Sequence, residues 1–175
     1  MAYTTARTWV TSELVTATLL NTHLRDNMTY VYACQAACHA YNAGAQAVTA
    51  TAVLTFDSED YDQGGMHSTS VNTSRLTVQT GGGGRYLLTS TFRVSSLGTS
   101  TAQAFFRKNG TTALHDGILL LALVNVIHTM ALPGVALVDG DYVEVLITKG
   151  DASSWEFGAA AGGARSQFGA VRIGG

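Results

Sequence analysis

The fold is decided by a stretch that reads Ala102-Gln103-Ala104-Phe105-Phe106-Arg107-Lys108-Asn109-Gly110. Its first seven residues are rich in apolar and aromatic side chains, and Asn-Gly follows them directly. Both central residues of a type I′ turn need a positive φ, which Asn and Gly tolerate best. The stretch therefore predicts a strand over 102–108 and a hairpin turn at Asn109-Gly110.

Short β segments of this kind, separated by glycine-rich turns, continue from Ala52 to the end of the chain. The spacing of apolar residues changes there from the helical period to the strand period. Short strands without interleaved helices favour a mainly β fold, a β-sandwich of the jelly-roll type. We expect strands near 52–56, 75–80, 85–95, 102–108, 117–130, 135–138, 141–148 and 166–173, with turns at 63–65, 81–84, 116–117, 133–134, 139–140 and 162–163.

The first 31 residues have a different pattern. Tyr3 to Val10 alternates apolar and polar residues, which predicts an extended arm. A helix then begins with Thr16 as its N-cap, and its apolar residues fall on one narrow stripe. Because a lone helix of this kind is marginal in water, we expect the stripe to need a surface to bury it. The stripe consists of Leu20, Leu24, Met28 and Val31.

Residues 32–51 are rich in alanine, and Gly44 is a candidate helix stop. We therefore expect the end of the helix and a linker there, which leaves 52–175 as the β-domain. Cys34 and Cys38, the two cysteines of the chain, then fall on one helix face. Their spacing, with His39, fits neither a disulfide nor a known zinc or haem motif. We expect small buried thiols.

Charge is scarce in this chain. Charged residues make up 13% and hydrophobic residues 46% of the 175 residues, and the formal net charge is −2. So few charges favour an oligomer or an assembly subunit, and they give no footprint for nucleic acid or an anionic membrane. The longest apolar run, 118–127, is shorter than the roughly 18 residues that span a bilayer. With no signal-peptide pattern at the N-terminus, we expect synthesis in a cytoplasm.

Three short patterns could belong to a phosphate-binding, calcium-binding or catalytic site, and each also has a purely structural explanation. Gly81 to Gly84 with Arg85 lacks the Lys-Ser/Thr of a phosphate loop. An acidic segment over 57–62 suggests calcium but fits no EF-hand, and His115-Asp116 has no framed nucleophile. We predict a hairpin loop, an exposed acidic loop and a turn, with no catalytic residue, no cofactor and no metal. The acidic residues are Asp57, Glu59, Asp60 and Asp62.

The sequence pattern of residues 8–27 is more specific than these three patterns. It runs Thr-Trp-Val-x-x-Glu-Leu-Val-Thr-Ala-x-x-Leu-Asn-x-x-x-Arg-Asp-Asn and resembles the N-termini of structural proteins from tailed bacteriophages. The resemblance implies membership of a virion, with capsid or tail proteins as partners. The side chains that we expect to anchor the chain there are Arg7, Trp9, Leu20, Leu24, Arg25 and Met28.

Three segments of the β region resemble C1q-like and TNF-like domains. They are Gly84-Arg85-Tyr86-Leu87-Leu88-Thr89-Ser90-Thr91-Phe92, Asp139-Gly140-Asp141-Tyr142-Val143-Glu144-Val145 and Gln167-Phe168-Gly169-Ala170-Val171-Arg172-Ile173. The family's second aromatic is replaced by Leu88. Such domains are jelly rolls that form trimers, so the resemblance implies a homotrimer.

The run 118–127 is apolar on both faces, which favours a central strand packed against neighbouring subunits, although a buried helix stays open. Our expected trimer interface consists of Leu119, Leu121, Leu123, Tyr86 and Phe168.

Three classes of function fit these observations. The first is a structural subunit of a phage, namely a trimeric capsid decoration (cement) protein that docks by its N-terminal arm and stabilises the particle. The second is a short tail fibre, spike or minor tail protein that binds a host receptor. The third, a glycan-cleaving enzyme, is disfavoured because no pair of carboxylates at catalytic separation is identifiable. The chain has no repetitive shaft, which favours decoration.

Overall fold

The computed structural model describes residues 4–5, 7–32, 36–96, 101–120, 126–150, 154–158 and 165–174. The chain divides into two compact units, residues 1–35 and residues 36–175. We call them the arm and the β-domain. The arm contains one helical segment, built from α1 (Ala17–Leu20), a π-helical turn η1 (Asn21–Arg25) and α2 (Asp26–Tyr32).

The start of the arm helix follows the sequence prediction. Thr16 has extended backbone angles, and its side-chain oxygen accepts a hydrogen bond from the backbone N–H of Leu19 at 3.2 Å. This bond satisfies one of the N–H groups that have no partner within the helix. The π-helical turn was not predicted. Such turns are rare in proteins, and those that occur are often found at functional sites.

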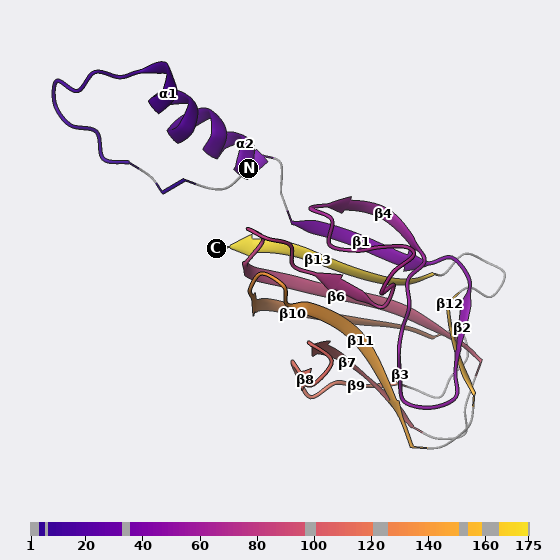
Figure 1. The fold of residues 1–175 in the computed structure, drawn as a ribbon. Helices are drawn as coiled ribbons and strands as arrows, with labels where there is room; N and C mark the ends of the chain where they lie inside the picture. The colour runs from indigo at the N-terminus through magenta and orange to yellow at the C-terminus, as the bar shows by residue number, and fades with distance from the viewer. Residues whose placement is uncertain are drawn as a thin grey trace. The chain divides into compact units, whose positions relative to one another are not determined.

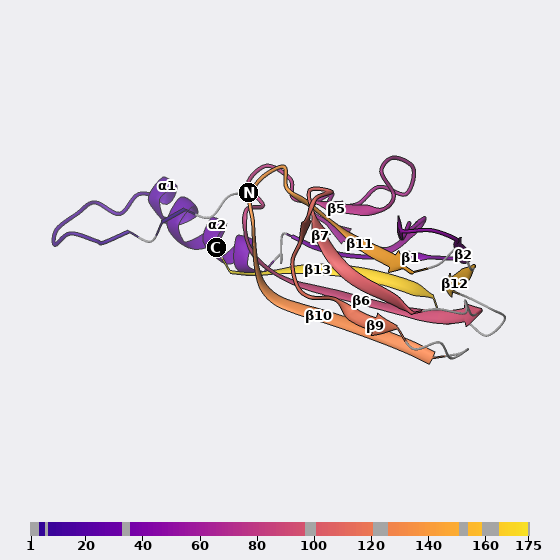
Figure 2. The ribbon, with the colours of Figure 1, turned by 90° about the horizontal axis from the view of Figure 1, so that it is seen from below.

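The β-domain consists of two antiparallel sheets, which have seven and six strands among the described residues. Figure 1 shows β1, β13, β6 and β10 side by side in the first sheet, and Figure 2 shows β7 and β11 in the other layer. Sheet A contains β1 (Ala37–Asn42), β2 (Ala45–Val48), β4 (Ser58–Gln63), β6 (Gly84–Ser96), β10 (Val126–Leu137), β12 (Trp155–Gly158) and β13 (Ser166–Gly174). Sheet B contains β3 (Ala52–Val53), β5 (Arg75–Thr77), β7 (Ala102–Lys108), β8 (Thr112–Ala113), β9 (Ile118–Leu120) and β11 (Tyr142–Lys149).

The central strand of sheet A is β6. It pairs with β10 along one side, and with β13 and then β12 along the other. Strand β13 continues the sheet to β1, and β1 continues it to β4. Alternate side chains of β6 are therefore fixed inward, where they meet sheet B, or outward. The inward set is buried and consists of Tyr86, Leu88, Ser90, Phe92 and Val94.

The hairpin turn predicted at Asn109-Gly110 is confirmed. Asn109 has φ 52° and Gly110 has φ 72°, and the backbone N–H of Thr111 donates to the carbonyl of Lys108 at 3.1 Å. Positive φ at both central residues is the property of a type I′ turn. Strand β7 has the predicted bounds, and the mainly β, jelly-roll class is also confirmed.

The expectation of a helix end and linker over 32–51 is wrong. Strands β1 and β2 occupy much of this segment, and the β-domain begins at Ala36 rather than at residue 52. Cys38 and Ala40 are fully buried because pairing of β1 with β13 and β4 turns them inward. Alanine favours helices, but tertiary pairing overrides this weak preference. Cys38 thus lies on a strand, and Cys34 falls outside the described residues.

Three further details differ from the sequence prediction. Pro133-Gly134 does not end a strand, because β10 continues through it with a shift of register between Leu132 and Val135. The acidic segment is strand β4 rather than a loop, since it pairs with β1. Strand β12 was not predicted at all. Residues 121–125 of the apolar run and the turn at 162–163 lie outside the described residues.

The placement of Tyr86 and Phe168 in the trimer interface is also wrong. Both side chains are 0% exposed in the single chain, since they fill the core between its own sheets. Burial raises the pKa of Tyr86 to about 12, and its hydroxyl donates to the carbonyl of Gly82 at 2.6 Å. Side chains with no exposed surface have no contact to give to a neighbouring subunit.

A substitution at Phe168 tests this correction. Phe168→Ala is expected to lower the free energy of unfolding by about 3 to 5 kcal/mol, because it leaves a cavity between the sheets. Val138→Ala, at a side chain that is 64% exposed, is the control and should change it by no more than about 0.5 kcal/mol. Urea denaturation measures both. Loss of the oligomer with unchanged chain stability would return Phe168 to the interface.

Candidate docking surfaces

The arm is folded back on its own helix. The backbone N–H of Thr4 donates to Oδ1 of Asn27 at 2.9 Å, and Nδ2 of Asn27 donates to the carbonyl of Thr4 at 2.9 Å. The ring of Trp9 meets that of His23 edge-on, with centroids 6.3 Å apart. These contacts join the extended leader to the helix, so the arm presents one joint surface.

The charges of the arm are paired within it. Arg7 forms an ion pair with Glu13 and lies over the Trp9 ring, 5.1 Å from its centroid. Arg25 pairs with Asp26 at 2.8 Å. The two arginines that we expect to anchor the chain therefore have a role in holding the arm together. A partner would meet a surface with no uncompensated charge among these side chains.

The apolar side chains of the arm are exposed. The predicted stripe residues Leu20, Leu24 and Met28 are 41%, 50% and 70% exposed, and Trp9 is 41% exposed. A soluble helix normally covers its apolar stripe with another part of the chain. The arm does not do so among its described residues, so the stripe is available to a partner. The further exposed apolar residues of the arm are Val10, Leu14 and Val15.

The outer face of sheet A is a second candidate surface. One row of outward residues crosses it from β4 through β1, β13 and β6 to β10, and it consists of Tyr61, His39, Gly169, Thr89 and Ala131. The next row consists of Ser58, Tyr41, Gln167, Thr91 and Thr129. Neither row contains Lys, Arg, Asp or Glu, and most side chains near its centre are small.

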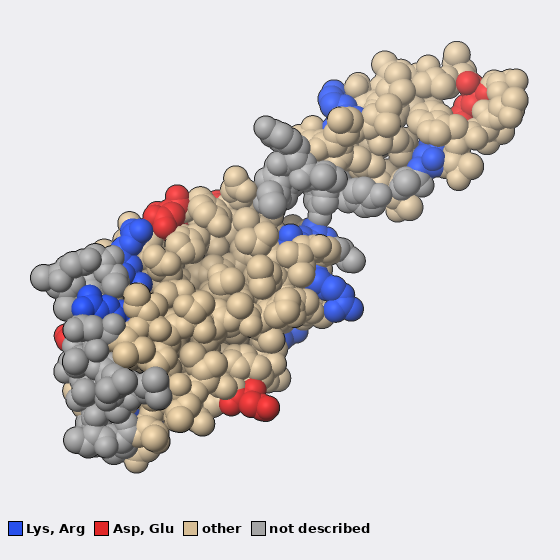
Figure 3. All heavy atoms as spheres, turned by 180° about the vertical axis from the view of Figure 1, so that it is seen from behind, with Lys and Arg blue, Asp and Glu red and all other residues tan. Residues whose placement is uncertain are grey.

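Charges lie around these rows rather than within them. Asp60 accepts from His39 at 2.8 Å, and Arg165 stacks on Tyr41 at 3.7 Å, both near the β4 side. Figure 3 shows the same character on one side of the β-domain, where blue and red atoms lie near the margins. Within the described residues, β10 pairs only with β6, so its other flank is an open edge. Open edges invite pairing or must be covered.

Of the remaining residues of the expected trimer interface, Leu119 is described and is 56% exposed on β9. Leu121 and Leu123 lie outside the described residues. Ile127, near the start of β10, is 59% exposed. The part of the apolar run that the structure describes therefore forms strands with apolar side chains at the surface, and not a helix.

The glycine loop before β6 already holds an anion, and it comes from this chain. The backbone N–H groups of Gly81 and Gly83 donate to the carboxylate of Asp139 at 2.7 and 2.9 Å. These hydrogen bonds, from Gly81 first, lower the pKa of Asp139. The loop thus closes around the turn that follows β10, which agrees with the expectation of a structural loop and leaves no cradle for phosphate.

The acidic residues of β4, and Asp57 just before it, are also engaged within the chain. Glu59 bonds to Nδ1 of His67 at 2.8 Å, and Asp62 accepts from the backbone N–H groups of Met66 and His67. Asp57 accepts from the backbone N–H of Ala43 at 2.9 Å. Among the described residues, no three His, Cys, Asp or Glu side chains gather in a group suited to a metal ion.

His115 and Cys38 have structural surroundings. The backbone N–H groups of Phe106 and Gly117 each lie 2.9 Å from a ring nitrogen of His115, Nε2 and Nδ1 respectively, and the neutral ring accepts from one of them. Burial lowers the pKa of His115, although Asp116 opposes this shift. Burial, together with Asp62 and Glu59, raises the pKa of Cys38, which makes its thiol a poor nucleophile.

His128 on β10 is a buried polar residue that the sequence analysis did not identify. Its ring stacks on Phe92 with centroids 5.9 Å apart, and its buried Nε2 has no hydrogen-bond partner. Burial lowers the pKa of His128. Protonation would place a charge against the apolar core, so the neutral ring is the form that fits this fold.

The comparisons with known proteins concern the fold. The chain matches the globular domain of zebrafish complement 1qA with 12% sequence identity and a TM-score of 0.54, over 79% of this chain and 97% of that chain. It matches murine APRIL, crystallised at pH 8.5, with 16% identity and a TM-score of 0.54, over 76% and 96% of the chains.

The β-domain therefore has the C1q/TNF-like jelly-roll fold. No protein-family model and no curated protein sequence matches the chain. In the part of the chain that the structure describes, every helix falls short of the length and apolarity that crossing a membrane requires.

Half-buried His115 and buried His128 predict a loss of stability in mild acid. Folding lowers the pKa of both side chains from the ordinary histidine value near 6.5. Below that pH the unfolded chain therefore binds more protons than the folded chain. Stability is thus complete above about pH 6.5 and falls as the pH drops toward the folded values. His128→Phe keeps a ring against Phe92 and should reduce this loss. Urea midpoints at about pH 8 and 5.5 measure it, and an unchanged loss in the variant would exclude His128 as a cause.

Proposed function

We propose that this chain is a structural subunit of a tailed-bacteriophage virion, a homotrimer that docks through its arm and acts without catalysis. The carrying observation is the arm, in which the large apolar side chains are exposed while the charges are paired. A surface of this kind gains free energy only when a partner buries it. The wording of residues 8–27, with its resemblance to phage structural proteins, supports a virion as the place where that partner lies.

The β-domain supports the trimer. Its C1q/TNF-like fold has a low-charge outer face on sheet A and, among the described residues, an open edge at β10. Two chains that met there would bury few charges, so desolvation would cost little. A trimer would also cover the edge, which otherwise invites uncontrolled strand pairing. His39, toward the β4 side of this face, is held by Asp60 at 2.8 Å.

Within the virion we favour a capsid decoration protein that stabilises the particle. Many copies, each burying a standard interface of roughly 1,600 Å², would oppose the pressure of packaged DNA. The alternative is a short tail fibre, spike or minor tail protein that binds a host receptor. The copy number per particle separates the two, since decoration needs hundreds of copies and a tail structure only a few to tens. Neither solved neighbour bears the name of an enzyme.

Substitutions on the arm stripe test the docking role. Leu24→Ser with Met28→Ser should reduce the occupancy of particles at least about tenfold, because two large contacts are lost from a desolvated interface. Thr18→Ser with Thr29→Ser, at exposed positions of the same helical segment, is the matched control and should leave occupancy unchanged. Quantitative mass spectrometry of purified virions measures it.

Particles that carry the stripe variant should lose DNA at lower temperature but adsorb to cells normally. Normal heat stability with lost adsorption would replace decoration by the fibre role. Full occupancy of the stripe variant would mean that the arm is not the anchor.

A charge on the sheet A face tests the trimer. Ala131→Asp should convert the protein from a mass of three chains to the single-chain mass of 18.3 kDa, because it places an unpaired carboxylate in the contact. Ala113→Asp, on the exposed strand β8 of sheet B, is the control and should remain trimeric. Light scattering reads both masses. A monomeric wild type, or a trimeric Ala131→Asp variant, would contradict the assignment.

A further inference from the structure

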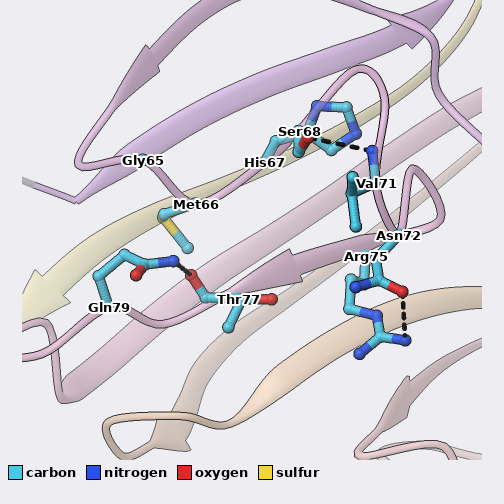
Figure 4. A pocket seen from close by; sticks show the side chains of 9 residues that line it. All are labelled: Gly65, Met66, His67, Ser68, Val71, Asn72, Arg75, Thr77 and Gln79. Atoms are coloured by element: carbon cyan, nitrogen blue, oxygen red, sulfur yellow. Dashed lines mark hydrogen bonds between the residues drawn. The ribbon is translucent and has the colours of Figure 1, made fainter.

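One pocket of the β-domain is built around an arginine. It has a volume of about 240 Å³ and lies between the segment after β4 and strand β5. Figure 4 shows the side chains around it, with Arg75 next to Asn72 and Gln79 next to Thr77. The lining residues include Arg75 but no Asp or Glu: they are Gly65, Met66, His67, Ser68, Val71, Asn72, Arg75, Thr77 and Gln79.

The guanidinium of Arg75 is held in a fixed orientation. It lies over the ring of Tyr142, on the neighbouring strand β11, with its central carbon 4.2 Å from the ring centroid. Its Nη2 donates to Oδ1 of Asn72 at 3.1 Å. Asn72 has φ 54°, a left-handed conformation, which turns the chain so that this amide reaches Arg75. A preoriented planar guanidinium suits a planar anion such as a carboxylate.

Arg75 forms no direct ion pair with a carboxylate of the described residues. Glu144 is its cross-strand partner, but that carboxylate accepts from Arg107 at 2.8 Å and from Ser74 at 3.4 Å. Within the described residues, no carboxylate forms an ion pair with Arg75. Lys108, by contrast, pairs with Asp141 at 2.6 Å. An arginine that is partly buried in a pocket without an acid attracts an anion from outside.

From this geometry we propose that the pocket binds a small carboxylate-bearing polyol of the size of one acidic sugar residue. The carboxylate lies against the Arg75 guanidinium. The hydroxyls of Ser68 and Thr77 and the amide of Gln79 supply the neutral hydrogen-bonding groups that sugar hydroxyls need. Buried Met66 and the exposed Val71 give the apolar contact for the sugar ring. This site is independent of the virion role of the arm.

The test uses the full chain and sodium glucuronate as the probe, with glucose and inorganic phosphate as comparison ligands. Affinity is read from saturation-transfer NMR titrations, and the site from crystals soaked in glucuronate. We expect glucuronate to bind in the pocket, glucose to bind at least about tenfold more weakly because it lacks the carboxylate, and phosphate not to displace glucuronate at equal concentration.

Two variants locate the binding. Arg75→Gln should weaken glucuronate binding about tenfold or more. Asn72→Gly accepts the positive φ but removes the amide that orients Arg75, so it should weaken binding in a chain that still folds. Arg85→Gln, at an arginine that donates to the carbonyl of Gly134, is the matched control and should bind like the wild type.

The proposal is overturned if glucuronate does not bind, if glucose binds as tightly, or if phosphate competes equally. It is likewise overturned if Arg85→Gln weakens binding as much as Arg75→Gln, or if Asn72→Gly, correctly folded by its circular dichroism spectrum, binds like the wild type.

Discussion

The β-domain depends on the contact of aromatic rings between its two sheets. Phe168 of sheet A stacks on Phe106 of sheet B with centroids 5.8 Å apart, and it also meets Phe56 at 5.6 Å. Toward β12, Phe92 meets Phe157 edge-on at 5.8 Å. Once these rings point inward, strand alternation determines which residues point outward. The identity of the outer faces is therefore a consequence of the core.

The same alternation explains why the chain tolerates so few charges. On sheet A, the two central outward rows carry Thr, Gly, Ala and Gln beside His39, Tyr41 and Tyr61, and the outward arginines of β6, Arg85 and Arg93, lie beyond these rows. The face is crowded at Gly169, because a Cβ there would lie 2.9 Å from Oγ1 of Thr89. A face with few charges costs little to desolvate, and β10, which pairs only with β6 among the described residues, offers an edge beside it, so the face suits a contact with a second copy.

The sequence predicts features that depend on neighbouring residues. The hairpin at Asn109-Gly110 and the N-cap at Thr16 follow from the local chemistry of the backbone, and both are confirmed. Strand β1 was missed because its small residues, such as Cys38 and Ala40, acquire a strand conformation only through pairing with β13 and β4. Acidic β4 was missed for the same reason.

The two candidate docking surfaces also differ in whether a local sequence pattern reveals them. The arm stripe has a helical spacing that is visible in one segment of sequence. The outer rows of sheet A join residues such as His39, Thr89 and Gly169, which are far apart in the chain, so no local pattern reveals them. The pocket at Arg75 also gave no signal, because its geometry depends on Tyr142 from another strand.

The anion-binding groups of the β-domain fall into two kinds, those that bind a carboxylate of this chain and Arg75, which does not. The glycine loop is filled by Asp139, and Arg107 by Glu144, so these groups serve the fold. Arg75 lies across the strand from Glu144 and yet is oriented by an amide and an aromatic ring instead of an acid. A neutral amide fixes a guanidinium without cancelling its charge. The positive charge of Arg75 therefore stays available to a ligand. A carboxylate in place of the Asn72 amide would also hold the guanidinium, but it would neutralise this charge.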